Sequence, residues 1–274
     1  MEFAEFVDFA ETIDATTADH DIINHVTDLF LHADEDLPII ARFVQGRIFP
    51  AWSMKKLDIG PNFCYEAIAR AAGHNISVDD IEERLAEMGD IGDVAASYEF
   101  GTQQGLDAFG NSEQSTLTVT DVYEELKSLA TIEGEGSQDE KITILFGLFN
   151  RCSSMEAKYL ARLVLNEMRI GVGEGTVRDA IAQAFDIPVE NVERALQVSN
   201  DYGEVAVTAR EEGINGLDAM ELQIGRPIKM MLAQDGTIDE AIEEWEKVGV
   251  ETKFDGARVQ IHVGDSVSIF SRNM

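Results

Sequence analysis

The sequence is poor in basic residues. Among 274 residues, 21 are Lys or Arg and 52 are Asp or Glu, so the formal net charge is −31. Taken alone, this charge argues against a nucleic-acid partner, because the phosphates would repel the protein. Molar salt screens charges over about 3 Å, and a densely acidic surface then keeps a protein hydrated. We therefore favour a protein of a high-salt cytosol over an acidic protein of ordinary cytosol.

Cysteines and long apolar runs are also scarce. Cys64 and Cys152 are the only cysteines and lie far apart, which argues against a disulfide framework or a metal site and indicates buried thiols in a reducing compartment. No apolar run reaches the roughly 18 residues of a membrane span. The acidic amino terminus, residues 1–6, is not a signal peptide. We expect a cytoplasmic protein with no membrane partner.

Two segments are basic in spite of the total charge. Residues 42–70 hold five basic and two acidic side chains, and residues 141–178 hold six basic and three acidic ones. Contact with phosphates would explain two positive segments in a strongly acidic chain. Chance together with internal salt bridges explains them equally well from composition alone.

Residues 1–220 have the periodicity of helices, with apolar residues three or four apart and little β-branched alternation. Helices are expected near residues 3–10, 22–30, 36–45, 61–73, 78–87, 91–98, 119–132, 138–149, 154–168, 175–185 and 188–198. Ser137 with Glu140 fits a capping box, and Ser154 with Glu156 fits one more weakly. Residues 101–116 are typical of a surface connection. We predict an all-α domain over residues 1–220.

The pattern changes near residue 221. One amphipathic helix is predicted over residues 237–248. Val259, Ile261 and Val263 then alternate with polar residues, in the period of a half-buried strand. A turn at Gly264-Asp265 leads to a second strand. Because two strands and one helix cannot form a stable core alone, we predict that residues 221–274 are the start of a truncated α/β domain.

Residues 251–258, which read Glu-Thr-Lys-Phe-Asp-Gly-Ala-Arg, carry the clearest chemistry. A lysine amine attacks an α-phosphate only when it is deprotonated, and partial burial or a nearby cation such as Arg258 favours that form. Glu251 would share the strand face of Lys253 and meet the same nucleotide. The other interpretation makes residues 255–256 a simple hairpin turn and Glu251–Lys253 a surface pair worth under about 1 kcal/mol.

Residues 251–262 resemble the signature of the covalent nucleotidyltransferases, the superfamily of DNA ligases, RNA ligases and capping enzymes. The resemblance implies that Lys253 binds AMP through a phosphoramide bond and that Glu251 contacts adenine. It also implies that Arg258 contacts the ribose and phosphate side. The next motif of the family ends a strand with Ser-Arg, and Ser271-Arg272 matches it. Arg272 would then lie near AMP and the nick phosphate.

The helical part resembles the amino-terminal DNA-binding domain of archaeal and eukaryotic replicative-type, ATP-dependent DNA ligases. The matching segments are residues 44–47, 88–92, 134–139, 151–159, 168–173, 200–204 and 226–233. This resemblance implies an enzyme that seals nicks in duplex DNA during replication, repair and recombination. ATP is the implied AMP donor, and Mg²⁺ is expected for phosphoryl transfer. The implied partner is nicked duplex DNA, with a sliding clamp as a further candidate, and we expect a monomer.

Two glycine-rich loops add a physical argument for phosphate binding. One loop precedes the helix expected near residue 175, and the other, residues 134–136, precedes the helix expected near 138. Such a loop presents backbone N–H groups and the positive end of a helix dipole to a phosphate, although either loop alone is more simply an ordinary turn. With the resemblance, the predicted DNA contacts are Ser137, Gln138, Arg151, Lys158, Arg169, Gly171 and Gly173. The acidic residues that would oppose DNA there are Glu135, Asp139, Glu140 and Glu174.

Two functions from different classes therefore remain. The first is an ATP-dependent DNA ligase, of which this chain holds the DNA-binding domain and the start of the adenylation domain. Because the later motifs of the family are absent from residues 1–274, we expect this chain alone to bind DNA weakly and not to complete ligation. The alternative is a non-catalytic DNA-binding module with a vestigial nucleotidyltransferase motif.

Overall fold

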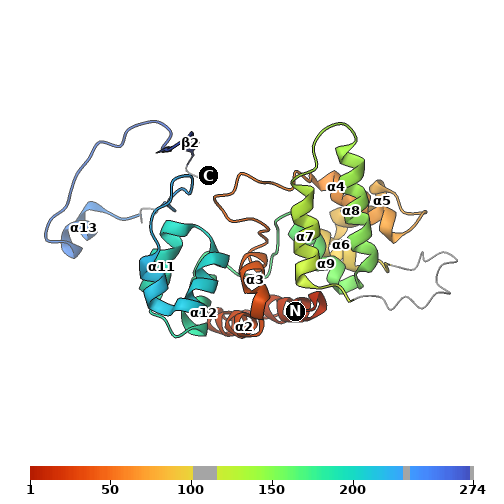
Figure 1. The fold of residues 1–274 in the computed structure, drawn as a ribbon, viewed down its shortest axis with the longest axis horizontal. Helices are drawn as coiled ribbons and strands as arrows, with labels where there is room; N and C mark the ends of the chain where they lie inside the picture. Colours follow the sequence, from red (N-terminus) through yellow and green to blue (C-terminus); the bar gives the residue numbers. More distant parts are fainter. Residues whose placement is uncertain (101–115, 231–234, 272–274) are drawn as a thin grey trace.

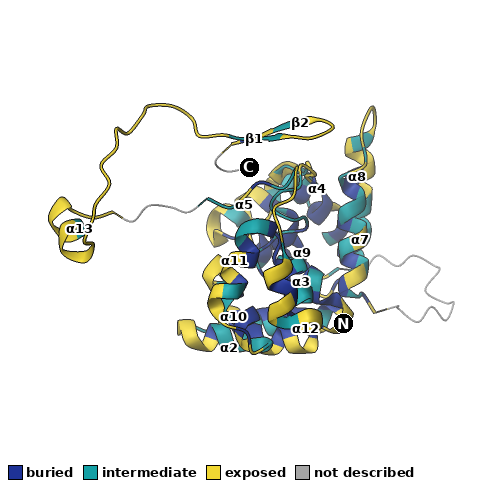
Figure 2. Ribbon diagram, turned by 60° about the vertical axis from the view of Figure 1, so that its left-hand side comes forward, coloured by how far each residue is buried: buried dark blue, intermediate teal, exposed yellow. Residues whose placement is uncertain are grey.

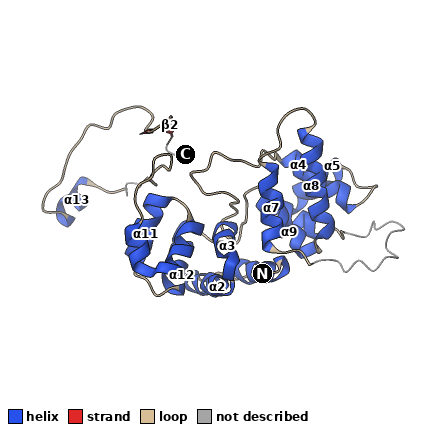
Figure 3. Ribbon diagram, viewed as in Figure 1, coloured by secondary structure: helices blue, strands red, loops and turns tan. Residues whose placement is uncertain are grey.

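The structure, a computed structural model, describes residues 1–100, 116–230 and 235–271. Within these ranges almost all regular structure is helical, and the strands form one hairpin near the carboxyl end (Figure 3). This agrees with the predicted fold class, an all-α amino-terminal part followed by the start of an α/β part. The connection expected over residues 101–116 lies almost entirely outside the described residues.

The described helices up to residue 219 divide between two groups and a connecting layer (Figure 1). The connecting layer comprises α1 (Phe3–Asp14), α2 (Asp19–His32), a 3-10 turn (Asp34–Asp36) and α3 (Leu37–Phe43). The first group comprises α4 (Pro61–Ala72), α5 (Val78–Met88), α6 (Ile91–Ala96), α7 (Val119–Leu129), α8 (Ser137–Arg151) and α9 (Ser154–Val164). The second group comprises α10 (Glu174–Ala184), α11 (Val189–Ser199) and α12 (Tyr202–Ala219).

One continuous cluster of buried side chains joins both groups to the connecting layer. In the first group, α4 packs on α8 and α6 packs on α9, whereas in the second α10 packs on α2, and α12 packs on α3 and α11. Aromatic side chains of the connecting layer, among them Phe3, Phe6 and Phe43, are fully buried. Figure 2 shows that the buried residues gather where the helices face one another. The apolar periodicity of the sequence therefore marks real core faces.

Local side-chain chemistry explains where several helices begin. The capping boxes are Ser77 with Asp80 at α5, Thr118 with Asp121 at α7, Ser153 with Glu156 at α9, and Thr237 with Glu240 at α13 (Ile238–Glu244). In each, the hydroxyl accepts from the N3 amide and the N3 carboxylate accepts from the N-cap amide. These pairs satisfy amides that the helix itself leaves open.

The capping boxes expected at Ser137 and Ser154 are wrong. Helix α8 has Gly136 as its N-cap, with φ of 84°, and Ser137 already belongs to the first turn. Glycine adopts this left-handed conformation without steric cost, and no side chain caps the first turn of α8. At α9 the capping hydroxyl is that of Ser153, one residue earlier than expected.

A buried ion cluster ties α9 to α1 and to the start of α6. The guanidinium of Arg162, whose side chain is 6% exposed, lies 3.1 Å from Asp90 and 3.3 Å from Asp14. The ammonium of Lys158 and the hydroxyl of Tyr159 both donate to one carboxylate oxygen of Glu11, each at 2.6 Å. Burial alone would raise the pKa of Glu11, but these two hydrogen bonds and the nearby cations outweigh burial and lower it. The cluster therefore ties three helices together through two largely buried cations, while Glu11 and Asp14 stay partly exposed.

The carboxyl-terminal part is more open. It contains α13 and the hairpin of β1 (Gln260–Val263) and β2 (Val267–Phe270), paired antiparallel with Ile261 opposite Ile269. The alternation expected in β1 is present, but the expected faces are reversed. Ile261 and Val263 are 59% and 68% exposed, while Gln260 and His262 lie on the less exposed face. The reason is that the polar pair is hydrogen-bonded to residues 225–228, whereas no described element covers the apolar face.

No described helix combines the length and the apolar character that a membrane crossing requires.

The ion cluster predicts an uneven response to loss of an arginine. Arg162→Leu leaves Asp90 buried without its closest cation, and we expect the free energy of unfolding to fall by about 3–5 kcal/mol. Arg70→Leu removes an exposed i,i+4 pair with Glu66 and should cost less than about 1 kcal/mol. Urea unfolding of both variants at one fixed salt concentration measures the difference. Equal losses would show that the cluster contributes no more than a surface pair.

Candidate nucleic-acid interface and nucleotide-accepting segment

The turn between α9 and α10 carries the glycine-rich segment 168–173. Arg169 and Gly171 have φ of 53° and 72°, and Gly173 is the N-cap of α10. Gly171 lets the chain reverse direction before the helix, because a positive φ costs glycine little. Gly173 has no side chain to accept from the first amides of α10. These N–H groups, at the positive end of the helix dipole, are therefore available to an outside anion.

A second glycine brings the loop after α3 against this turn. Gly46 has φ of 70°, and a Cβ atom on it would lie 3.1 Å from both the carbonyl carbon of Asn166 and the nitrogen of Met168. Glycine is the residue that permits this approach at this backbone angle. Gln45 and residues 168–173 line one cavity of about 360 Å³. The segments 44–47 and 168–173, far apart in the sequence, therefore form one surface.

Two arginines flank this surface. The Arg169 side chain is 50% exposed and pairs with Glu167 at 2.6 Å and with Asp90 at 3.3 Å. The Arg47 side chain is 39% exposed and lies 3.7 Å from the carboxylate of Glu174. The exposed pairs, Arg169 with Glu167 and Arg47 with Glu174, are worth about 0–1 kcal/mol each, so a phosphate can compete with these two carboxylates. Arg47 is not among the predicted contacts, although it lies in both the basic segment 42–70 and the matching segment 44–47.

Glu174, in the first turn of α10, is held by cations. Its carboxylate accepts a short hydrogen bond from the ammonium of Lys229 and lies near Arg47. Burial would lower the pKa of Lys229, but the hydrogen bond to Glu174 and the neighbouring Tyr202 outweigh burial and raise it. The negative charge expected to oppose a phosphate at this helix start is therefore largely balanced by its neighbours.

Lys158 and Arg151 do not lie on this surface as free cations. Lys158 belongs to the buried ion cluster, where Glu11, Asp14 and Asp93 surround its ammonium at 2.6 to 3.7 Å. Three carboxylates from other helices therefore already pair with Lys158, and a phosphate would have to compete with them. Arg151 is partly exposed at the end of α8 and pairs with Glu125 at 2.6 Å.

The second glycine-rich loop lies at the start of α8. Gly134 and Gly136 both have positive φ, of 98° and 84°, and Gln138 is exposed while Ser137 is half-buried. Three neighbouring acidic residues of this loop are also exposed, namely Glu135, Asp139 and Glu140. Figure 1 shows this loop at the upper end of α8. Among the described residues, no hydrogen bond or ion pair joins it to the surface around Gly46, so the two glycine-rich loops remain separate.

The candidate nucleotide-accepting segment, residues 251–258, is exposed. Glu251, Lys253 and Arg258 all lie in a stretch without regular structure, and none of the three forms an ion pair or hydrogen bond with another described residue. The strand face that Glu251 and Lys253 were expected to share is absent, because no described strand includes or pairs with these residues. Arg272 lies outside the described residues. In this structure the three side chains are not brought together into a pocket, so they do not by themselves fit an enclosed nucleotide.

No group of three or more His, Cys, Asp or Glu side chains in the described ranges could hold a metal ion. The described residues therefore contain no preformed cluster of this kind for Mg²⁺.

The segment 224–230 connects the helical part to the hairpin. Arg226 pairs with Glu204 at 2.6 Å, and its guanidinium lies 4.6 Å from the ring centre of Trp52. The backbone N–H of Lys229 donates to the carbonyl of Gln197 at 3.1 Å. On its other side, Gln260 of β1 exchanges two hydrogen bonds with the backbone of residue 228, at 2.9 and 2.7 Å. The connection is thus held by both parts, and it carries the hairpin that follows Lys253.

The sequence matches two protein-family models. One, described as the DNA ligase N terminus, covers residues 2–182, and the other, described as the ATP dependent DNA ligase domain, covers residues 230–274. The first match includes the ion cluster and both glycine-rich loops, and the second includes residues 251–258. The matched ranges thus include the surface formed by residues 44–47 and 168–173 and the segment around Lys253.

Curated relatives carry the same description. The chain is 61% identical over 277 residues to a DNA ligase of Haloarcula marismortui, with all of this chain and 50% of that protein covered. A DNA ligase of Halobacterium salinarum is also 61% identical, with 100% of this chain and 49% of the relative covered. DNA ligase 2 of Methanosarcina acetivorans is 43% identical, with 99% and 48% covered. The chain therefore spans about half the length of the curated relatives it matches.

The contact of Gly46 predicts a sharp effect of one methyl group. Gly46→Ala forces a positive φ on alanine and a 3.1 Å contact with the backbone of residues 166–168, and we expect it to cost about 1–3 kcal/mol of unfolding free energy. The control is Gly147→Ala within α8, where a Cβ meets nothing within 4 Å. That change should be neutral or stabilising by up to about 1 kcal/mol. If urea unfolding shows the two variants to be equally stable, the loop contact is not as tight as described.

Proposed function

We propose, on the premise that this chain belongs to the DNA ligase family, that it holds the DNA-binding part and the start of the nucleotidyltransferase part of an ATP-dependent ligase. The reaction would be the sealing of nicks in duplex DNA. The observation that carries the proposal is the meeting of residues 44–47 with residues 168–173 at the start of α10. This contact places the exposed side chains of Arg47 and Arg169 and the uncapped backbone amides after Gly173 on one surface.

The gathered groups suit a phosphate backbone better than base edges. Helix-terminal N–H groups and arginines bind phosphate oxygens without reading sequence. An enzyme that seals any nick needs this kind of contact. Arg47, Arg169 and the amides after Gly173 would therefore position the duplex, and they would do so at any sequence.

The lysine chemistry rests on the family membership and on residue type. In the proposed reaction the deprotonated amine of Lys253 attacks the α-phosphate of ATP, forms a phosphorus–nitrogen bond and releases pyrophosphate. The AMP then passes to the 5′-phosphate of the nick, and attack by the 3′-hydroxyl joins the strands and releases AMP. Glu251, Arg258 and Arg272 are proposed to contact the nucleotide. A need for Mg²⁺, a sliding clamp as partner and a monomeric state stay predictions from the resemblance.

The exposure of Lys253 limits how much of the reaction we assign to the described residues alone. Because Glu251, Lys253 and Arg258 do not enclose a pocket, we propose that the residues described here are insufficient for efficient adenylation. The same exposure is what a non-catalytic DNA-binding module with a vestigial motif would show. The ligase and the non-catalytic module therefore differ in one property. In the ligase Lys253 reacts with ATP when the rest of the domain surrounds it, and in the module it does not.

We expect the chain to bind nicked duplex DNA weakly, with equal affinity for duplexes of unrelated sequence. Fluorescence anisotropy across a potassium chloride series measures both properties, and the logarithm of affinity should fall linearly with the logarithm of salt concentration. Intact duplexes of several sequences serve as controls. A strong preference for one sequence would contradict positioning through phosphates, and no binding at any salt would refute the DNA contact.

The role of Lys253 is tested with a chimera that joins, after Met274, the part of the Haloarcula marismortui relative that this chain does not cover. With ATP labelled at the α-phosphate, we expect the chimera to retain label on a denaturing gel and to seal a nick, and the 274-residue chain to show at most a trace. Lys253→Arg in the chimera should remove both activities. Label that persists in this variant would refute the assignment of Lys253, and a folded chimera without label would favour the non-catalytic module.

A further inference from the structure

Most cations of the helical part are paired with carboxylates. Of the fifteen Lys and Arg residues in the described residues up to 220, ten have a carboxylate oxygen within 4.0 Å. The five that have none in this part of the structure are Lys55, Lys56, Arg84, Lys141 and Arg194. Arg84 lies over the ring of Tyr98, and Arg194 donates to carbonyls at the end of α12. Lys55, Lys56 and Lys141 therefore differ from the other cations of the helical part, because they lack a carboxylate partner in a chain with 52 acidic residues.

These three lysines lie together. Lys141 of α8 is buried, and its ammonium donates to the carbonyl of Leu57 at 2.9 Å. Lys55 and Lys56, the two residues before Leu57, are exposed. A carbonyl dipole satisfies one donor of Lys141 but does not cancel its charge. Three lysines therefore lie at the loop before α4, and no carboxylate oxygen in the described residues is within 4.0 Å of their ammonium groups.

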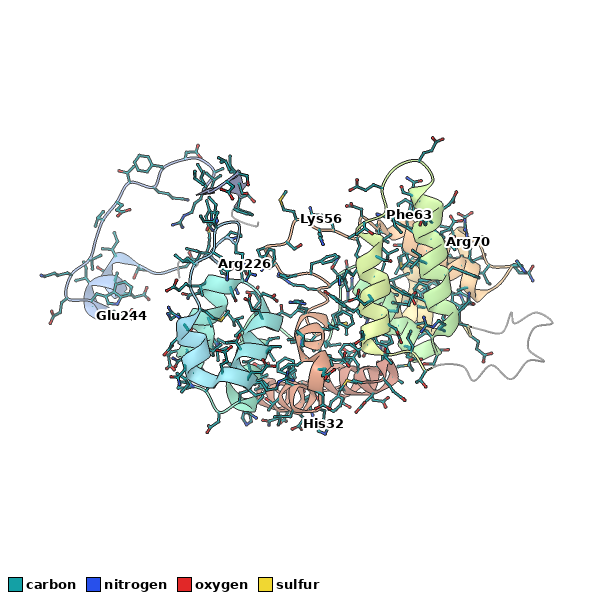
Figure 4. The ribbon with its side chains drawn as sticks, in the orientation of Figure 1. His32, Lys56, Phe63, Arg70, Arg226 and Glu244 are labelled. Atoms are coloured by element: carbon teal, nitrogen blue, oxygen red, sulfur yellow. The ribbon has the colours of Figure 1, made fainter. Side chains whose placement is uncertain are left out.

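The loop borders a cavity of about 690 Å³ that adjoins the surface around Gly46. Arg47, Lys55 and Lys56 line it, and Asp58 is the one carboxylate among its lining residues. Gln45 lines both this cavity and the one beside residues 168–173, so the two are neighbours. Figure 4 places Lys56 on a loop between the two helical groups, with Arg226 to one side and Phe63 to the other.

We propose that Lys55 and Lys56, with Lys141 behind them, form a second binding site for the phosphodiester backbone of duplex DNA. The site continues the surface of residues 44–47 and 168–173, and the inference rests on the DNA binding proposed above. An anion approaching this acidic protein is repelled least where cations lack carboxylate partners. Lysine ammonium groups on flexible stems act as point charges, which suits phosphates whose positions vary along a backbone.

The test compares the 274-residue chain with Lys55→Gln/Lys56→Gln by anisotropy on a nicked duplex, over salt concentrations at which circular dichroism shows both to be folded. Loss of two phosphate contacts should lower the salt slope by about 2 and the affinity by roughly tenfold per contact near 0.1 M salt, with little change near 1 M. Lys55→Arg/Lys56→Arg keeps both charges and should bind like the unchanged chain.

A matched control removes two positive charges elsewhere on the helical part. Arg70→Gln/Lys127→Gln changes the net charge equally, at two exposed residues outside the cavity. We expect it to keep the salt slope of the unchanged chain. An equal loss in this control would overturn the inference, because the effect would then be one of total charge.

The remaining outcomes separate the two proposals. If the unchanged chain binds and the Lys55→Gln/Lys56→Gln variant binds with the same affinity and slope, the second site is wrong while the proposed function stands. If the unchanged chain binds no duplex at any salt, both are overturned. A double variant that loses affinity for fluorescent ATP but keeps its affinity for DNA would overturn the assignment to a DNA backbone and indicate a nucleotide phosphate.

Discussion

The candidate interface depends on the close approach of Gly46 to the backbone of residues 166–168. Helices α3 and α9 end far apart in the sequence, and this contact is what places their following turns side by side. A side chain at Gly46 would separate them. Arg47 and Gln45 would then no longer border the open amides of α10, and the cavity beside Lys55 and Lys56 would lose its link to that surface.

The acidic composition of the chain explains why unpaired cations on this surface matter for phosphate binding. A net charge of −31 means that carboxylates are available to nearly every cation, and most cations of the helical part have taken one. Where the carboxylates come from other helices, as around Arg162, the pairs hold the fold together. Cations that stay unpaired cost nothing in folding if they are exposed, and they are the ones able to receive a phosphate. Some basic residues thus pair with carboxylates inside the protein, and the others are open to a phosphate.

The segment with Lys253 stands apart from the helical part. Its only described attachment runs through the connection 224–230, which Arg226 and Lys229 hold on one side and Gln260 and His262 on the other. The helical part therefore positions the connection, while Lys253 lies in an exposed stretch beyond it. Family membership and residue type support the chemistry proposed for Lys253, and the geometry supports the DNA contacts.

The sequence by itself determined the helices, the hairpin and the motif around Lys253. Apolar spacing and capping side chains act over a few residues, so their consequences can be read locally.

What only the tertiary structure decided is which basic residues face solvent. Lys158 was expected on DNA but pairs with Glu11, a residue 147 positions away, whereas Lys55 and Lys56 have no carboxylate oxygen within 4.0 Å among the described residues. The hairpin faces were reversed for the same reason, since hydrogen bonds from residues 225–228 decide which side of β1 is covered. Pairing of charges and covering of faces depend on distant elements, and a local pattern does not contain them.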